Sequence, residues 1–169
     1  DAARLFAEPR KAYVLFGCEP SLDVANPAQA LRALNAADMV VQFATFKDAD
    51  ALAYADVLLP IAPFSETSGT FVNAEGRVQS FHGVVKPLGE TRPAWKVLRV
   101  LGNMLGLQGF DFETSEEVRA SALGDLATIA TRLSNQTTAA IQLQGSTGGL
   151  ERIADVSIYS ADALVRRSE

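Results

Sequence analysis

Three short loops contain the residues whose types and spacing could serve a ligand site: Gly17-Cys18-Glu19-Pro20, Phe43-Ala44-Thr45-Phe46 and Pro60-Ile61-Ala62-Pro63. Each loop directly follows a short apolar run. If these runs are parallel strands, the loops lie together at the carboxyl edge of a sheet, where such sheets bind ligands. Gly17 and Pro20 suit a tight turn beside a ligand, but they are equally ordinary strand terminators. The first loop lacks the Gly-x-Gly-x-x-Gly spacing of a dinucleotide site, and no Walker-type lysine follows it.

Only two side chains invite an interpretation as nucleophile, base or soft metal ligand: Cys18 and His82, the one cysteine and the one histidine of the chain. These counts exclude a structural zinc site, an iron–sulfur cluster held by this chain and an internal disulfide. Cys18 has no histidine nearby in sequence, which favours an inert, partly buried thiol. His82 has no nucleophile elbow to serve, which favours a loop or surface histidine. We therefore predict no catalytic residue and no metal ligand.

The length, apolar content and charge of the chain exclude several classes of protein. The 169 residues suffice for one domain with an appendage, and the 48% that are apolar can fill a core. The 15 basic and 20 acidic residues give a net charge of −5, which without a basic run argues against a nucleic-acid partner. No apolar run approaches the ~18 residues of a membrane span, so we expect no direct membrane insertion. The chain begins at Asp1 and breaks off after a charged run, which we interpret as a piece of a longer protein.

The first half of the chain alternates apolar runs with helical patterns. The runs at residues 12–16, 39–43 and 57–59 predict strands, and the first resembles a strand buried on both faces. Asn26-Pro27 predicts the start of one helix, and residues 48–54 predict a second, short one. Strands alternating with helices indicate an α/β fold built on a parallel sheet.

The second half predicts different elements. Residues 69–81 form two short strands around the turn Asn73-Ala74-Glu75-Gly76. Helices are expected from Pro93 to Gly106 and over residues 115–133. Residues 145–149 have the composition of a flexible linker, and the tail after them is expected to pack on the body or on a partner. We divide the chain into residues 1–110, a helix at 111–135, and a linker and tail at 136–169.

The order of these segments resembles the molybdopterin oxidoreductase family. Ala55-Asp56-Val57-Leu58-Leu59-Pro60, followed by residues 64–79, resembles that family's ADVVLP…E–GT–N–EGRVQ signature, and Gly17-Cys18-Glu19-Pro20 is similar to its Gly-x-x-Pro loop. The resemblance implies a Rossmann-like domain, which in catalytic members holds one guanine-dinucleotide arm of the molybdenum cofactor. Carried over by position, the candidate contacts are Gly17, Glu19 and Pro20 in the first loop and Thr70, Asn73, Gly76 and Arg77 in the hairpin.

One departure points to a particular branch of the family. Catalytic members usually follow the Val-Gln of the second strand with an acid that reads the guanine edge, whereas here Phe43 follows Gln42. The tail, residues 154–167, resembles the end of the branch formed by the large iron–sulfur subunit of bacterial NADH:quinone oxidoreductase, respiratory complex I. That branch keeps the fold without the molybdenum site, so the resemblance implies that the seven candidate contacts are vestigial and that this chain holds no cofactor.

The complex I resemblance also implies partners. The parent subunit would carry 4Fe-4S and 2Fe-2S clusters in upstream domains, and this chain would pack against those domains and against other peripheral-arm subunits at the cytoplasmic side of the inner membrane. The fragment alone would not be redox-active. Two alternatives stay open: a cofactor-binding piece of a catalytic molybdopterin oxidoreductase such as a formate dehydrogenase, and a generic α/β domain that binds a small molecule.

Overall fold

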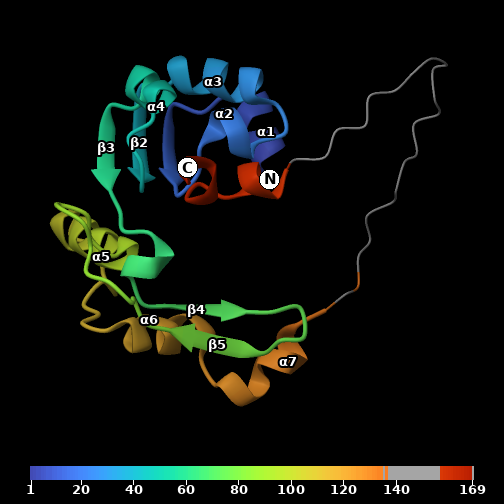
Figure 1. The fold of residues 1–169 in the computed structure, drawn as a ribbon, viewed down its shortest axis with the longest axis vertical. Coiled ribbons are helices and arrows are strands. Elements are labelled where there is room, and N and C mark those ends of the chain that lie inside the picture. Colours follow the sequence, from blue (N-terminus) through green and yellow to red (C-terminus); the bar gives the residue numbers. More distant parts are fainter. Residues whose placement is uncertain (135, 137–156, 169) are drawn as a thin grey trace.

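A parallel sheet of three strands in sequential order forms the centre of the N-terminal half (Figure 1). The strands are β1 (Ala12–Phe16), β2 (Met39–Ala44) and β3 (Val57–Pro60). The computed structural model describes residues 1–134, 136 and 157–168. In the sheet, Val14 lies opposite Val41, and Gln42 lies opposite Leu58. The predicted α/β fold with a parallel sheet is confirmed.

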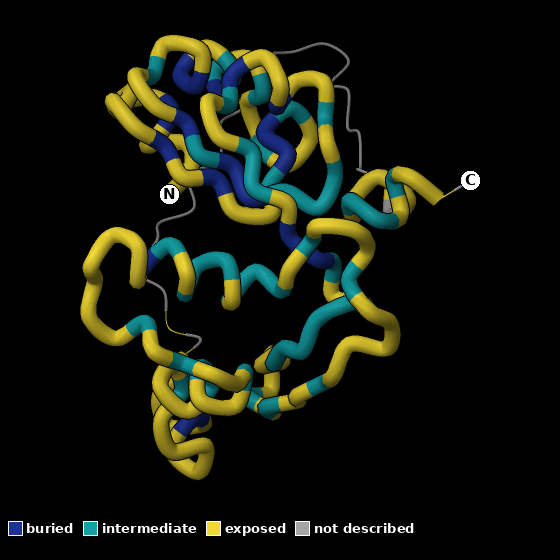
Figure 2. The backbone as a smooth tube through the Cα atoms, turned by 90° about the vertical axis from the view of Figure 1, so that its left-hand side faces the viewer, coloured by how far each residue is buried: buried dark blue, intermediate teal, exposed yellow. Residues whose placement is uncertain are grey.

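Short helices cover one face of this sheet: α1 (Ala2–Ala7), α2 (Pro20–Asp23), α3 (Pro27–Asn35) and α4 (Ala49–Tyr54). Asn26 caps α3, its Oδ1 accepting from the Gln29 N–H at 3.1 Å, and Asp48 caps α4 in the same way. The core between helices and sheet consists of Phe6, Tyr13, Leu15, Ala30, Ala33, Leu34, Val40, Ala51 and Tyr54. Figure 2 shows the buried residues concentrated in this part of the molecule.

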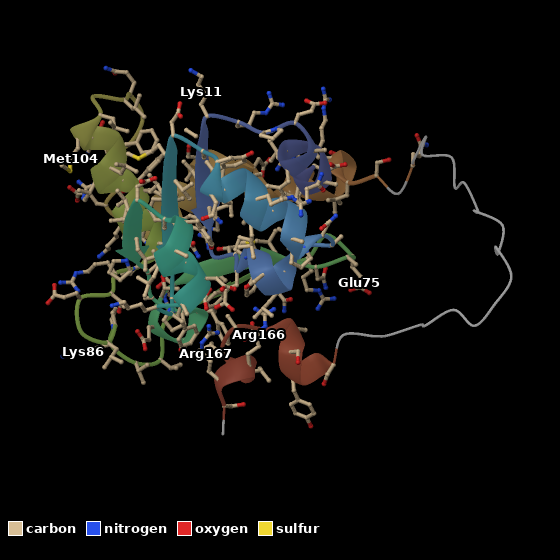
Figure 3. The ribbon with its side chains drawn as sticks, turned by 90° about the horizontal axis from the view of Figure 1, so that it is seen from above. Lys11, Glu75, Lys86, Met104, Arg166 and Arg167 are labelled. Atoms are coloured by element: carbon tan, nitrogen blue, oxygen red, sulfur yellow. The ribbon has the colours of Figure 1, made fainter. Side chains whose placement is uncertain are left out.

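The opposite face of the sheet is largely open, which corrects the expectation that residues 12–16 are buried on both faces. Side chains alternate along β1, so Tyr13 and Leu15 enter the core while Val14 is 68% exposed. Beside this face lies α5 (Ala94–Met104), seen with Met104 labelled in Figure 3. Between them is a groove of about 860 Å³ with a mainly aliphatic lining.

The hairpin occupies the region beyond the carboxyl edge of the sheet (Figure 1). It consists of β4 (Gly69–Val72) and β5 (Val78–Phe81), which pair antiparallel, and it follows the one-turn helix η1 (Phe64–Glu66). The predicted turn residues Asn73-Ala74-Glu75-Gly76 connect the two strands. The hairpin prediction is therefore confirmed.

The helix predicted over residues 115–133 is wrong as a single element. It is divided into α6 (Ser115–Leu123), η2 (Leu126–Thr128) and α7 (Ile129–Arg132). Gly124 ends α6 with a φ of 63°, a backbone conformation that side-chain-bearing residues rarely adopt. Asp125 then caps η2 by accepting from the Ala127 N–H. The apolar stripe continued across the break, which is why periodicity alone did not show it.

The C-terminal segment, residues 157–168, contains α8 (Ile158–Ala161) and η3 (Val165–Arg167). It lies at the carboxyl edge of the parallel sheet, near the ends of the β1 and β2 arrows in Figure 1. The expectation that the tail packs back on the body is confirmed for these residues, whereas the linker expected at 145–149 lies outside the described residues. None of the described helices combines the length and apolarity needed to cross a membrane.

The open face of the sheet generates a prediction. A parallel sheet is normally covered on both faces, so the isolated chain should self-associate and bind an apolar dye through this face. Val14→Lys places a charge on the open face at an exposed position and should reduce both light scattering and dye fluorescence, with the melting temperature nearly unchanged.

Val84→Lys is the matched control, because Val84 is 83% exposed in a loop away from the groove. This variant should associate as the unmodified chain does. A clean monomer without dye binding at high concentration of the unmodified chain would contradict the prediction.

Candidate functional site

The first loop connects β1 to α2 and is hydrogen-bonded to the carboxyl end of β2. Gly17 adopts a φ of 57°, and its N–H donates to the Phe43 carbonyl at 2.9 Å. The Glu19 N–H donates to Asp23 Oδ2 at 2.7 Å, and Pro20, fully buried at the first position of α2, has no N–H. The structure therefore brings the three predicted residues of this loop together, but their backbone donors are used within the protein or absent.

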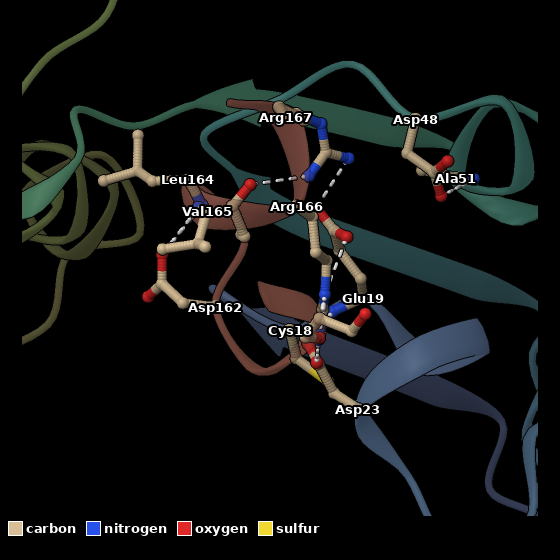
Figure 4. Close-up of polar contacts among 12 residues, drawn as sticks. Cys18, Glu19, Asp23, Asp48, Ala51, Asp162, Leu164, Val165, Arg166 and Arg167 are labelled. Atoms are coloured by element: carbon tan, nitrogen blue, oxygen red, sulfur yellow. Dashed lines mark hydrogen bonds and ion pairs between the residues drawn. The ribbon is translucent and has the colours of Figure 1, made fainter. Parts of the chain in front are cut away.

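The Glu19 carboxylate is the centre of an ion-pair network (Figure 4). Its Oε2 accepts from Arg166 Nη1 at 3.0 Å, and its Oε1 lies 2.9 Å from Arg167 Nη2. Arg166 also donates to Asp23 Oδ1 through Nη2. The Glu19 and Arg166 side chains are only 9% and 10% exposed, so both charges are largely removed from water. The hydrogen bond from Arg166 to Asp23 raises the pKa of the Arg166 guanidinium, and so does the hydrogen bond to Glu19, whereas burial lowers it. The net direction is upward.

Cys18 lies beside this network. Burial raises the pKa of its thiol, the carboxylates of Asp23 and Glu19 raise it further, and Arg166 lowers it. The net direction is upward, so the thiol stays protonated at neutral pH. This agrees with the prediction of an unreactive, partly buried cysteine.

Gln42 is a fully buried amide at the end of β2. Its Oε1 accepts from the Tyr54 hydroxyl at 2.8 Å, and its Nε2 donates to the Cys18 carbonyl at 3.2 Å. Burial, followed by the neighbouring Asp48 carboxylate, raises the pKa of Tyr54 to about 12. Phe43, the next residue along β2, is also fully buried and packs against Phe16 with ring centroids 5.4 Å apart.

The hairpin candidates have structural roles in the turn. Asn73 Oδ1 accepts from the N–H groups of Glu75 at 3.0 Å and Arg77 at 2.9 Å, which closes the turn. Gly76 supplies the φ of 80° that this turn requires. The Arg77 guanidinium lies 3.9 Å from the Glu75 carboxylate, with both side chains exposed. Asn73 and Gly76 thus shape the hairpin backbone.

Thr70 lies in β4, where its Oγ1 is 3.0 Å from Ser80 Oγ across the hairpin. Ser80 Oγ also accepts from Arg119 of α6 at 2.7 Å. Among the described residues, no hydrogen bond or ion pair connects the hairpin candidates with the first loop. The structure therefore does not bring the two predicted groups into one contact network.

Sequence reasoning missed four residues of the site: Asp23, Tyr54, Arg166 and Arg167. Two signals were present, namely two acids four positions apart at Glu19 and Asp23 and two adjacent arginines near the end of the chain. The attraction between these charges depends on the fold, because Asp23 and Glu19 are 143 and 147 positions from Arg166 in the sequence. His82 lies away from the first loop, exposed and with Nδ1 3.3 Å from Ser68 Oγ.

Metal-binding side chains do not cluster in the described part of the chain, where no group of three His, Cys, Asp or Glu residues could hold an ion. A further cavity of about 270 Å³ lies between the hairpin and α6, lined by apolar groups with Trp95 and Arg119. Of the seven candidate contact residues predicted from the sequence, Thr70 alone lines this cavity.

The parallel α/β sheet and the hairpin that follows it define a class of protein, and comparison with known families identifies that class. The family model for molybdopterin oxidoreductases matches residues 2–104. The chain belongs to the molybdopterin oxidoreductase family. The family resemblance is therefore confirmed, and the interpretation as a generic α/β binding domain is wrong.

The relatives that this chain matches are much longer than the chain itself. A Staphylococcus aureus (strain bovine RF122 / ET3-1) protein named "Putative formate dehydrogenase" is 46% identical over 70 residues, which are 40% of this chain and 7% of that protein. The corresponding protein of strain USA300 is 44% identical over 70 residues, again 40% and 7%. Acetylene hydratase from Pelobacter acetylenicus superimposes with a TM-score of 0.56 at 26% identity, covering 69% of this chain and 17% of the hydratase. The chain thus spans less than a tenth of the two Staphylococcus aureus proteins and less than a fifth of the hydratase.

The burial of the Tyr54 hydroxyl generates a pH prediction. Tyr54 ionises near 10 when unfolded and about 12 when folded, so the folded state holds its proton more tightly. The resulting stabilisation is complete below pH 10 and is lost as the pH rises through 12. Ultraviolet titration of tyrosinate should show a phase near 12, and the free energy of unfolding should fall across this interval.

Tyr54→Phe should remove the phase near 12. It should also lower the free energy of unfolding at neutral pH by ~1–3 kcal/mol, because Gln42 Oε1 loses its donor inside the protein. Tyr159→Phe, at an exposed position of the C-terminal segment, serves as the control. A Tyr54→Phe variant that keeps the high-pH phase would contradict this assignment.

Proposed function

We propose that this chain is an architectural domain of the large iron–sulfur subunit of an NADH:quinone oxidoreductase of the complex I type, and that it holds no molybdenum cofactor. The observation that carries the proposal is Phe43. In catalytic members the corresponding position usually bears an acid that reads guanine, and here it bears a fully buried aromatic ring packed on Phe16.

The chemistry of guanine recognition supports the proposal. The guanine edge needs a hydrogen-bond acceptor, and each of its donors left unpaired in a buried site costs ~1–3 kcal/mol. The phenylalanine ring is no substitute for a carboxylate. Gln42, the neighbouring polar side chain, already uses its amide oxygen for Tyr54 and its amide nitrogen for the Cys18 carbonyl.

The chemistry of phosphate recognition gives independent support. A pyrophosphate is held by free backbone N–H groups or by cations. In the first loop the Gly17 and Glu19 N–H groups donate within the protein, and the guanidinium groups of Arg166 and Arg167 beside it already pair with Glu19 and Asp23. These residues do not fit an anionic dinucleotide, which supports the interpretation of the seven candidate contacts as vestigial.

The proposed parent subunit carries electrons from NADH toward quinone through iron–sulfur clusters held by its upstream domains. This chain would contribute packing and assembly rather than electron transfer. Its partners would be the upstream domains of the same subunit and other peripheral-arm subunits, at the cytoplasmic side of the inner membrane. The largely uncovered sheet face supports such contacts, since it offers an aliphatic surface for neighbouring structure.

A second candidate is a cofactor-binding piece of a catalytic molybdopterin oxidoreductase. The observation in its favour is the 46% identity over 70 residues with a relative named "Putative formate dehydrogenase". Under this alternative, Thr70, Asn73, Gly76 and Arg77 would approach the cofactor from the hairpin. The two candidates differ in whether the parent protein contains molybdenum.

Metal and nucleotide analysis tests the absence of the cofactor. The full-length parent protein, produced in cells that make molybdenum cofactor, should contain molybdenum at background level and release no guanine nucleotide on denaturation. A catalytic formate dehydrogenase purified in parallel is the positive control. Stoichiometric molybdenum or released guanine nucleotide would favour the second candidate.

Gene deletion tests the parent activity. Cells without the parent protein should lose NADH-driven quinone reduction in their membranes and keep formate oxidation. The full-length gene should restore NADH oxidation. A gene from which the segment corresponding to this chain has been removed should not restore it. Immunoblotting compares the amounts of the two proteins. Loss of formate oxidation with intact NADH oxidation would contradict the proposal.

A further inference from the structure

We propose that the segments following β1 and β2 form a binding site for arginine side chains and that the C-terminal segment, residues 157–168, is its separable ligand. The site, called here the guanidinium receptor, consists of Glu19, Asp23 and Phe46. The proposal concerns peptide recognition by this chain and does not depend on the activity of the parent protein.

Charge pairing is the first argument. Each carboxylate oxygen of Glu19 faces a different guanidinium, Arg166 at 3.0 Å and Arg167 at 2.9 Å, and Arg166 bridges to Asp23 (Figure 4). Hydrogen bonds between ionised groups are among the strongest in proteins. In the described part of the chain, every ion pair of Glu19 and Asp23 is with Arg166 or Arg167. Without the segment, two neighbouring carboxylates would lose these cations.

The planar shape of the guanidinium group makes the receptor specific for arginine over lysine. The Arg167 guanidinium lies over the Phe46 ring, 4.2 Å from its centroid. A planar guanidinium stacks on an aromatic face while its N–H groups remain directed at a carboxylate, which a lysine ammonium does not reproduce. Arg166 likewise uses separate nitrogens for Glu19 and Asp23.

The receptor is organised by the body of the chain. The Glu19 N–H donates to Asp23 Oδ2, which leaves Oδ1 for Arg166. Pro20 is fully buried and fixes the backbone between the two acids. The Cys18 carbonyl is held by Gln42 Nε2. The Asp23 carboxylate and the backbone that bears Glu19 are therefore positioned by contacts that do not involve the C-terminal segment.

The segment is likewise shaped by its own contacts. Asp162 Oδ1 accepts from the N–H groups of Leu164 at 2.8 Å and Val165 at 3.2 Å, which starts η3. Arg166 Nε donates to the Ser160 carbonyl at 2.6 Å, and Arg167 Nη1 donates to the Ala163 carbonyl at 3.0 Å. The segment thus presents both guanidinium groups from one small folded unit, and Figure 3 shows them on its side facing α2 and α4.

Two side chains account for the polar attachment. Among the described residues, the hydrogen bonds and ion pairs between residues 157–168 and the rest of the chain all involve Arg166 or Arg167. A ligand attached through two arginines should leave when both are removed. It should also be replaceable by the same peptide added in solution.

Cys18 provides a native reporter, because it is the single cysteine of the chain and lies beside the receptor. In the full chain, Arg166→Ala combined with Arg167→Ala should raise the rate of Cys18 modification by a neutral thiol reagent by about tenfold, a shift in equilibrium that corresponds to ~1.4 kcal/mol. Losing Arg166 removes a charge that lowers the thiol pKa, which by itself slows the reaction. A faster reaction therefore reports exposure rather than charge.

A synthetic peptide with the sequence of residues 157–168 should restore protection of Cys18 in the double variant. The same peptide with both arginines replaced by alanine should not, and one with two lysines should protect weakly. Arg10→Ala is the matched control, since Arg10 pairs only with the exposed Glu8 among the described residues. Circular dichroism checks that each variant keeps its fold.

Three outcomes would overturn the proposal: an unchanged labelling rate in the double variant, failure of the peptide to protect, or equal protection by the alanine peptide. Sedimentation over a range of concentrations identifies the source of the ligand when every chain carries Val14→Lys, which reduces association through the open sheet face. A monomer with protected Cys18 supports the segment of the same copy. A dimer that the double variant dissociates overturns that assignment in favour of a second copy.

Discussion

The buried amide of Gln42 is the interaction on which the carboxyl edge of the sheet depends. An amide inside a protein must have both its donor and its acceptor paired, and here Tyr54 satisfies the oxygen and the Cys18 carbonyl satisfies the nitrogen. One side chain therefore connects β2 to α4 and to the first loop. The position of that loop in turn places Glu19 where the two arginines of the C-terminal segment reach it.

The two faces of the parallel sheet differ in how completely they are covered. The helix-covered face buries Leu34 and Val40 almost completely, whereas Val14 on the opposite face stays exposed beside an aliphatic groove. A sheet of three parallel strands with one open face offers apolar surface to a neighbour. The chain spans 7% of a curated relative's length and 17% of acetylene hydratase, so much of the architecture around such a domain in these proteins lies outside the matched region.

The residues that carry the family resemblance mostly shape the backbone. Asn73 and Gly76 form the hairpin turn, and Gly17 and Pro20 shape the first loop. A motif of this kind identifies a fold, because the same dihedral angles are required whether or not a nucleotide is bound. Function depends on the side chains added to that backbone. Here the aromatic ring of Phe43 and the acid pair Glu19 and Asp23 are the side chains on which the proposal of an absent dinucleotide rests.

The sequence by itself determined the three strands, the helix start at Asn26, the short helix after Asp48 and the hairpin, because these features follow from short-range patterns of apolar residues, hydrogen-bonding caps and turn formers. It also determined the family. The break at Gly124 was missed because an apolar stripe continues across it. Only the tertiary structure decided that one sheet face is open and that Arg166 and Arg167 pair with Glu19. Such pairing across more than a hundred residues depends on which loops the fold brings together, and no local pattern encodes that distance.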